Sequence, residues 1–477
     1  MNPARQLHRN LKPRQLTMIA IGGVIGAGLF VGSGVVINDA GPGAFLSYGI
    51  TGLLMILVMR MLGEMATSNP STGSFADYAR RALGGWAGFS VGWLYWYFWV
   101  IVVGFEAVAG AKVLSYWIDA PLWVLSLGLM LLMTCTNLFS VASFGEFEFW
   151  FAGIKVAAII AFLVLGGAFV LGFWPERTLD FSNLVAHEGF LPHGPEAIFS
   201  AIVVVVFSMV GAEVATIAAA ETEDPVRSVT KAMKSVVVRI SIFYVGSLFL
   251  LAVIVPWNST ELGASPFVTA FTVMGIPFAD TVMNAVVLTA VLSCLNSGLY
   301  TSSRMLFVLA ARREAPAALT RVSRGGVPMV AILASSVVGF LCVIAAAISP
   351  DGVFLFLLNS SGAIILFVYL LIALSQIVLR RRAKEEELTV KMWLFPGLSI
   401  LTAAAIAAVL LQMAMTSGTQ VSLALSCLSW AVVLGIYVAV RKRGGSVDMP
   451  DPAAAEAPGP SLVMAESAAP GDVQAKV

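Results

Sequence analysis

The chain has 477 residues, of which 59% are hydrophobic and only 12% are charged, and its formal net charge is +1. Soluble domains carry about 25% charged residues, so the composition excludes an ordinary soluble domain and predicts an all-α membrane protein. The balanced charge gives no indication of a nucleic-acid partner. The four widely spaced cysteines suggest neither a disulfide framework nor a metal site, so we expect no metal and no cofactor.

Twelve apolar runs, bounded by charged or turn residues, are each long enough to cross a bilayer core of about 30 Å. The third, eighth and tenth runs are longer than one crossing needs, which predicts tilted or extended helices. The predicted transmembrane helices cover residues 17–38, 43–66, 87–115, 122–141, 149–173, 197–220, 235–257, 279–310, 328–349, 353–380, 391–415 and 419–440.

The distribution of Lys and Arg predicts the orientation, because cytoplasmic loops carry an excess of both. With a cytoplasmic N-terminus, Arg177 lies in an outside loop, Lys112 and Lys155 lie within helices, and the other 25 of 28 basic residues are cytoplasmic. This asymmetry requires an even number of crossings and both termini inside. The expected divisions are a cytoplasmic tail (1–16), helices 1–5 (17–173), an outside loop (174–196), helices 6–10 (197–380), helices 11–12 (391–440) and a disordered cytoplasmic tail (444–477).

The first helix is unusual because six glycines lie within residues 17–37, TMIAIGGVIGAGLFVGSGVVI. Glycine costs about 1 kcal/mol relative to alanine inside a helix, so the cluster predicts a deliberate break. Backbone groups freed by a break are tolerated in hydrocarbon only where they line a cavity or meet a ligand. The positive end of a half-helix favours an anionic group such as a carboxylate. Gly22-x-x-x-Gly26 also fits a helix-packing motif, whereas a dinucleotide loop is disfavoured because no strand precedes it.

Ionisable residues inside membrane helices are costly and are candidate functional residues. Glu64 lies near the cytoplasmic end of its helix, where we expect a structural pairing with Arg60, Arg80 or Arg81. Glu106 lies deep in the third helix, where it can bind a substrate ammonium group, hold a proton or pair with another helix.

Two further ionisable residues lie in the fifth and sixth helices. Lys155, in FWFAGIKVAAII, can carry a proton through a transport cycle or occupy the place of a bound sodium ion, although a snorkelling interfacial lysine is the alternative. Glu213 follows the small residues Ser208, Gly211 and Ala212, which predict a second broken helix. Two interrupted helices in corresponding halves of a chain are the best sequence indication of a transporter site.

Several of these segments together resemble the amino acid–polyamine–organocation (APC) superfamily, in particular its bacterial amino acid permease branch. The resemblance covers about residues 10–440 and rests on GGVIGAGLFVGSG, AGPGAFLSYGITGLLMILVMRMLGEMATSNP, GEFEFWFAGIKV, FSMVGAEVATIAAAETEDP and SCLNSGLYTSSRMLF. Within the branch, GWLYWYFWV, RISIFY and SCLNSGLYTSSRM are most similar to GABA permeases. ASPF and GFLPHG are more similar to permeases for aromatic and other neutral amino acids.

The resemblance implies a LeuT-like fold, in which helices 1–5 and 6–10 form inverted repeats with broken helices 1 and 6, and two further helices follow. It implies that amides of helix 1 bind the substrate carboxylate, that helix 6 receives the amine and side chain, and that Phe207 acts as a lid. Glu106 is the candidate for placing the amine. The implied substrate-binding residues are Ile25, Gly26, Ala27, Gly28, Glu106, Phe207, Ser208, Met209, Gly211, Ala212 and Glu213.

Lys155 matches the fifth-helix lysine that replaces a sodium site in proton-coupled relatives, and Ser293 and Ser297 are its expected neighbours. The resulting hypothesis is a monomeric, proton-coupled amino acid symporter of the bacterial inner membrane, for GABA or a related ω-amino or neutral amino acid. An exchanger of the same fold and an amino acid sensor remain as alternatives. A channel is disfavoured because the sequence has no charge ring or carbonyl filter motif, and no catalytic constellation suggests an enzyme.

Overall fold

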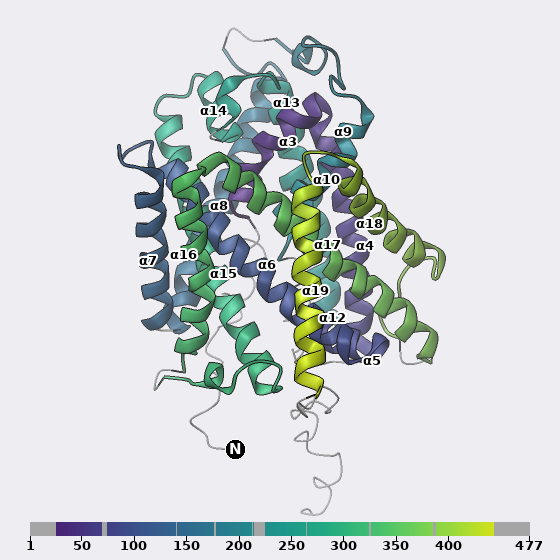
Figure 1. Ribbon diagram of the computed structural model, residues 1–477. Helices are drawn as coiled ribbons and strands as arrows, with labels where there is room; N and C mark the ends of the chain where they lie inside the picture. Colours follow the sequence, from purple (N-terminus) through teal and green to yellow (C-terminus); the bar gives the residue numbers. More distant parts are fainter. Residues whose placement is uncertain are drawn as a thin grey trace, which may run out of the picture.

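The computed structural model is an all-helical bundle in the part of the chain that it describes (Figure 1). Long helices run between two ends of the molecule. Helices α5 (Ser74–Leu83) and α12 (Pro225–Val238) lie at one end, and α9 (Pro195–Ser200) and α14 (Pro266–Val273) lie at the other. The described residues are 25–68, 74–139, 141–175, 178–211, 213, 225–263, 265–323, 326–384 and 388–442.

The first half starts with two short helices in series, α2 (Ala27–Phe30) and α3 (Gly32–Ala40). A short 3-10 turn, η2 (Gly41–Gly43), then leads into α4 (Ala44–Ser68). The apolar stretch Ala27–Ser68 has 42 residues, about 63 Å as one continuous helix, which is about twice the bilayer core. The turn, where Gly41 adopts a φ of +66°, therefore divides it. The remaining long helices of this half are α6 (Gly85–Leu114), α7 (Leu122–Phe139) and α8 (Val141–Val170).

The second half also begins with a short helix, α10 (Ile202–Met209), which follows α9 and the 3-10 turn η3 (Ser182–Leu184). A π-helical stretch, η4 (Arg239–Gly246), joins α12 to α13 (Ser247–Ile254). The later elements are η5 (Thr260–Gly263), α14, α15 (Ala279–Ala311), η6 (Ala317–Thr320), α16 (Met329–Ile348), α17 (Pro350–Arg382), α18 (Gly397–Met415) and α19 (Gln420–Lys442).

Two predicted helix boundaries differ from the structure for identifiable reasons. The fifth helix was expected from residue 149, but α8 starts at Val141, because Glu148 is fully buried inside the bundle and does not mark a helix end. The eleventh was expected from residue 391, but α18 starts at Gly397, directly after Pro396. The apolar segment before Pro396 instead binds α4, since the Met392 amide donates to Glu64.

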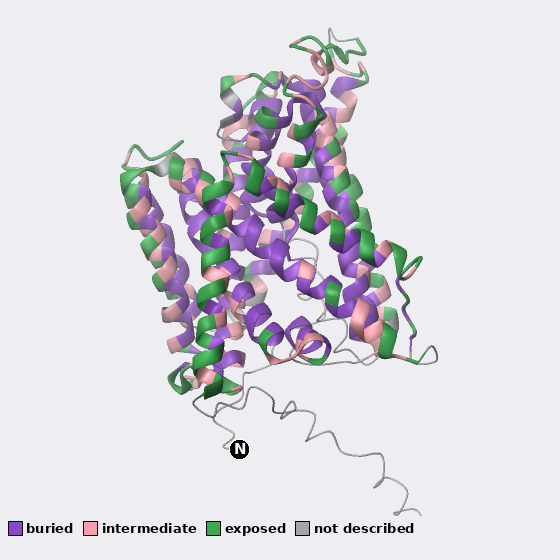
Figure 2. Cartoon of the chain, turned by 45° about the vertical axis from the view of Figure 1, so that its right-hand side comes forward, coloured by how far each residue is buried: buried purple, intermediate pink, exposed green. Residues whose placement is uncertain are grey.

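Many large apolar side chains are exposed on the long helices, whose exposed residues are green in Figure 2. Leu53 on α4, Val164 on α8 and Leu411 on α18 are each about 60% exposed. Large exposed apolar areas mark membrane or protein contacts rather than a water-exposed face. Ten helical segments in the described part are long and apolar enough to cross a membrane, as the prediction of an all-α, multi-pass membrane protein requires.

The centre of the bundle is formed by α6, which crosses it obliquely (Figure 1). Helices α15, α17, α16 and α5 all pack against α6, and the short helix α2 packs against α3, α10, α15 and α6. The short helices α2 and α10 also contact each other, and α10 packs against α17 and α4. This arrangement positions the site.

Candidate functional site

The described part of the first helix begins at the glycine cluster, directly after Gly26. The residues before Ile25 lie outside the described part of the chain, so the break in this helix stays a prediction. Gly26 is extended (φ −129°, ψ −156°) and α2 begins at the next residue, Ala27. The first amides of α2 have no partner inside the helix. A Cβ at Gly28 would lie 2.8 Å from Cα of Ser208 and 3.1 Å from the Phe207 ring. Glycine at position 28 thus allows α2 and α10 to approach backbone to backbone.

A carboxylate already occupies the start of α2. The Ala27 amide donates to both carboxylate oxygens of Glu106, at 3.1 and 3.2 Å. Glu106 is 1% exposed, and a Cβ at Gly26 would lie 2.5 Å from its Oε1 and 2.8 Å from Sγ of Cys294. In this structure α6 therefore supplies a carboxylate at the start of α2, where the glycine cluster predicts an anionic group.

The second interruption is at the end of α10. The helix ends at Met209, Val210 is extended (ψ 151°) and Gly211 has a φ of +102°. The Gly211 amide donates to Oε2 of Glu213 at 2.9 Å. This left-handed geometry requires little strain only for glycine, so Gly211 explains why the helix stops here.

Two tyrosines hold Glu213 from neighbouring helices. Tyr95 on α6 donates to Oε1 at 3.0 Å and Tyr369 on α17 donates to Oε2 at 3.2 Å. Glu213 is fully buried, and the three donors satisfy both of its oxygens. In this structure Glu213 thus fixes the break to α6 and α17 rather than facing the cavity.

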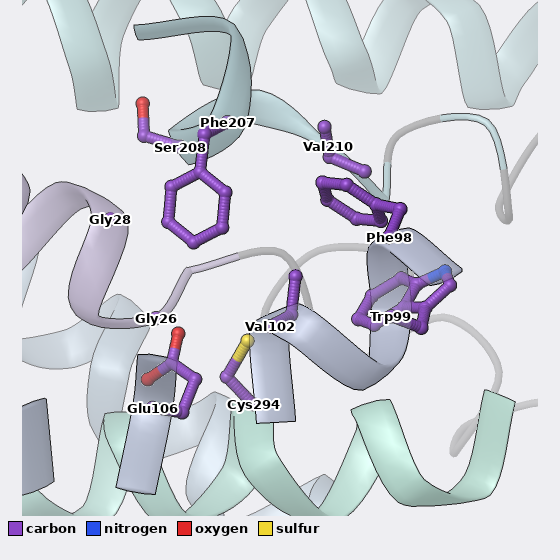
Figure 3. A pocket seen from close by; sticks show the side chains of 10 residues that line it. All are labelled: Gly26, Gly28, Phe98, Trp99, Val102, Glu106, Phe207, Ser208, Val210 and Cys294. Carbon is purple, nitrogen blue, oxygen red and sulfur yellow. The ribbon is translucent and has the colours of Figure 1, made fainter. Parts of the chain in front are cut away.

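A small cavity lies between the start of α2 and the end of α10. Five of the residues predicted to bind substrate line it: Gly26, Gly28, Glu106, Phe207 and Ser208. Figure 3 shows the Phe207 ring above Gly26 and the Glu106 carboxylate, with Cys294 beside that carboxylate. The Phe207 ring packs edge-on against Phe105, with ring centroids 4.8 Å apart.

The structure places other predicted residues off the cavity wall. The residues that do not line it are Ile25, Ala27, Met209, Gly211 and Glu213. The backbone amides of Ala27 and Gly211 still donate the hydrogen bonds described above. Ala212 lies outside the described residues. The wall residues that the sequence reasoning missed are Phe98, Trp99, Val102, Val210 and Cys294.

Lys155 lies in a fully buried polar cluster between α8 and α15. Its Nζ donates to Oγ of Ser293 at 2.8 Å, and that hydroxyl donates to Oε1 of Glu148 at 2.7 Å. Nζ also lies 3.9 Å from the same Oε1. All three residues are 0% exposed, so Lys155 does not snorkel to an interface. Ser297, one turn further along α15, is buried but its hydroxyl has no hydrogen-bond partner within the described structure.

Glu148 was also missed, although the sequence carries a signal for it. Residues 148 and 155 are seven apart, which places them on the same face of a helix two turns apart. Its Oε2 has no hydrogen-bond partner in the described part of the chain. Glu148 is therefore the countercharge of Lys155, a role that was not recognised from the sequence.

Ion pairs at the α5 and α12 end of the bundle are structural. The partner expected for Glu64 is wrong, because Glu64 binds Arg380 of α17 at 2.8 Å and accepts a hydrogen bond from Gln376. Arg80 instead pairs with Glu314, after α15. Burial raises the pKa of Glu314, and the charge of Arg80 opposes that shift.

A family profile described as amino acid permease matches residues 15–444. The chain belongs to the amino acid permease family. The permease is thus a membrane transport protein of the APC superfamily, as its motifs indicated, and its family is one of transporters rather than enzymes.

Its relatives include permeases named for gamma-aminobutyric acid and a transport protein named for aromatic amino acids. The permease is 53% identical over 442 residues to the gamma-aminobutyric acid permease of Bacillus subtilis, covering 92% of this chain and 94% of the relative. It is 46% identical over 413 residues to the gamma-aminobutyric acid permease of Escherichia coli (86% and 89% covered). The aromatic amino acid transport protein AroP of Corynebacterium glutamicum is 40% identical over 403 residues (83% and 87% covered).

Proposed function

We propose that the permease is a proton-coupled symporter that takes up GABA, or a related ω-amino or neutral amino acid, across the bacterial inner membrane. The observation that carries the proposal is the carboxylate of Glu106 on the Ala27 amide, at 3.1 and 3.2 Å, inside a cavity between the start of α2 and the end of α10. The start of α2 thus offers an amide that can bind one carboxylate. The GABA permeases at 46–53% identity supply the substrate class.

The fold we propose is LeuT-like, with twelve crossings, inverted repeats of helices 1–5 and 6–10, and both termini in the cytoplasm. The ten candidate spans support this count, because Ala27–Ser68 is divided by a turn into two and the shorter apolar helix Pro195–Met209 adds one more. The contact between α2 and α10 supports the pairing of the two broken helices. We propose that the monomer is the functional unit.

In the proposed binding step, the substrate carboxylate replaces Glu106 on the Ala27 amide. The displaced Glu106 side chain stays in the same small cavity and becomes the partner of the substrate ammonium group. Phe98, Trp99 and Phe207 provide aromatic faces for the methylene groups, and such faces also attract an ammonium group by cation–π interaction. One zwitterionic substrate molecule thus provides a hydrogen-bond acceptor for the Ala27 amide and a positive charge for the Glu106 carboxylate.

In the proposed coupling step, Lys155, Ser293 and Glu148 hold the transported proton. Ser293 and Cys294 are neighbours on α15. The Ser293 hydroxyl bonds Lys155 and Glu148, whereas Cys294 lies beside Glu106 on the cavity wall. A change in the charge of the buried cluster therefore alters the electrostatic environment one residue away, at the substrate cavity. When Lys155 gives up its proton to the cytoplasm, the bond to Ser293 weakens and α15 loosens its hold on the first helix.

Uptake into proteoliposomes tests the function. Purified permease is reconstituted, an inward proton gradient is imposed, and accumulation of radiolabelled GABA is competed by unlabelled amino acids. We expect accumulation that an uncoupler abolishes and that ω-amino acids compete best. Competition by aromatic amino acids alone would move the substrate to the class named for AroP. Exchange without net accumulation would refute symport, and binding without flux would refute transport.

A further inference from the structure

A crevice between α4, α12 and the segment before α18 combines an apolar floor with a basic rim. It encloses about 530 Å³ of empty space, including its open part. On its floor, Met59, Val236 and Met233 are at most 9% exposed. On its rim lie Arg60 and Lys234. The crevice is separate from the substrate cavity and shares no residue with it.

The helix periodicity explains why these side chains gather. On α4 the i, i+3, i+4 spacing brings together Ile56, Met59 and Arg60. On α12 the same spacing brings together Thr230, Met233, Lys234 and Val237. Each helix thus contributes one basic side chain next to apolar side chains that line the crevice. The two basic groups flank one apolar depression.

Arg60 is held in a fixed orientation by two contacts. Its Nε donates to the carbonyl oxygen of Lys391 at 2.9 Å, and its guanidinium lies 4.1 Å from the centre of the Trp393 ring. Within the described chain no carboxylate binds its two terminal nitrogens, since the nearby Glu64 is taken by Arg380. Those nitrogens are donors in a planar fork, which is suited to a phosphate group.

Lys234 provides a second positive charge at the crevice. The side chain is exposed, and the described residues include no ion pair or hydrogen bond to its Nζ. Trp393 is 48% exposed beside it. Tryptophan and basic residues together are typical of the level at which a membrane meets water, and α12 lies at one end of the bundle in Figure 1.

We propose that this crevice binds an anionic phospholipid, with its phosphate on Arg60 and Lys234 and an acyl chain on the Met and Val floor. The apolar floor favours a lipid over free phosphate, because phosphate alone would leave it uncovered. The basic rim favours an anionic over a zwitterionic headgroup, because a choline or ethanolamine ammonium would add positive charge beside two cations. Basic pockets between helices on the cytoplasmic side are known to suit such headgroups.

The test is native mass spectrometry of the intact detergent-solubilised permease, titrated with phosphatidylglycerol or phosphatidylcholine. We expect phosphatidylglycerol to be retained in preference. Lys234→Gln should weaken that retention about fivefold, since a basic group near a headgroup contributes about 1 kcal/mol. Arg60→Gln combined with Lys234→Gln should weaken it about 30-fold, which corresponds to about 2 kcal/mol. Lys231→Gln is the matched control, because Lys231 is also exposed on α12 but does not line the crevice.

Several results would overturn the proposal. Equal retention of the two lipids by the wild-type protein would show that the crevice does not select an anionic phospholipid. An equal loss of phosphatidylglycerol retention in Lys234→Gln and Lys231→Gln would show that the lipid does not bind at Lys234. Glycerol 3-phosphate that displaces the lipid at equal concentration would reduce the site to a phosphate site without a lipid. Lys234 makes no protein bond in the described structure, so we expect its substitution to leave folding unchanged. The thermal midpoint in phosphatidylcholine checks this.

Discussion

Replacement of Glu148 by glutamine tests the buried cluster most sharply. The variant keeps the size of the side chain but removes the charge 3.9 Å from Nζ of Lys155. At an effective dielectric constant of about 20, that separation corresponds to an attraction of about 4 kcal/mol. Breaking a buried pair by removing one partner typically costs 3–5 kcal/mol, because the other charge is left unpaired. We therefore expect Glu148→Gln to unfold at a clearly lower temperature than the wild type.

The double variant separates pairing from packing. Removing both charges of a buried pair is often neutral, so Glu148→Gln combined with Lys155→Met should recover most of the stability that either change alone loses. Thermal unfolding in detergent of the wild type, the two single variants and the double variant completes a double-mutant cycle. All three variants should lose proton-driven GABA accumulation in proteoliposomes.

The matched control is Glu146→Gln, at a half-buried acidic residue two positions earlier on α8, where a loss of only about 0–1 kcal/mol is expected. Additive losses in the cycle would show that Glu148 and Lys155 do not interact. A Glu148→Gln protein that accumulates GABA as well as the wild type would refute the role of the cluster in coupling.

Three further predictions concern the two helix breaks and the cavity. Gly28→Ala places a Cβ 2.8 Å from the α10 backbone and should reduce uptake at least tenfold, whereas Gly49→Ala, with no atom within 4 Å of its Cβ, should transport normally; equal activity of the two would contradict close packing at Gly28. Trp99→Leu removes an aromatic wall and should raise KM for GABA several-fold while Trp99→Phe does not, and an unchanged KM in uptake assays would place the substrate elsewhere. Glu213→Gln leaves one acceptor oxygen for three donors and should cost about 1–3 kcal/mol, so an unchanged thermal midpoint would mean that its hydrogen bonds are not important.

The sequence predicts a break in the first helix because glycine has a local cost in a helix that does not depend on the tertiary fold. Six glycines in residues 17–37 indicated an interruption and an anion site, and the structure places the helix start at Ala27. The occupant of that start was not predictable. Glu106 is 79 residues away from Ala27 in the chain, and only the packing of α6 against α2 brings them together.

Wall residues such as Trp99 and Cys294 could not be recognised from the sequence. Within a membrane helix they have the same apolar character as residues that face lipid or the core, and no periodicity separates these classes when the helix is apolar on all sides. Glu64 illustrates the same limit for charges: three nearby arginines were considered, but the tertiary fold pairs it with Arg380, 316 positions away.

Glu148 was missed for a different reason. An acidic residue at the edge of an apolar run usually marks where a helix leaves the membrane, and the fifth helix was predicted to start at residue 149, directly after Glu148. In the structure the helix extends through it and buries Glu148 against Ser293. The spacing of seven residues to Lys155 was the available signal, and it becomes informative only when the helix is known to start earlier.

The most direct test of the central claim is a measurement of proton flux driven by substrate. Permease is reconstituted into liposomes that contain a pH-sensitive dye, with no initial pH gradient, and GABA is added outside. We predict that the internal pH falls on addition of GABA to the wild type, and that the Lys155→Ala protein gives no such fall. GABA uptake at an unchanged internal pH, or proton influx that persists in Lys155→Ala, would contradict coupling through the buried lysine.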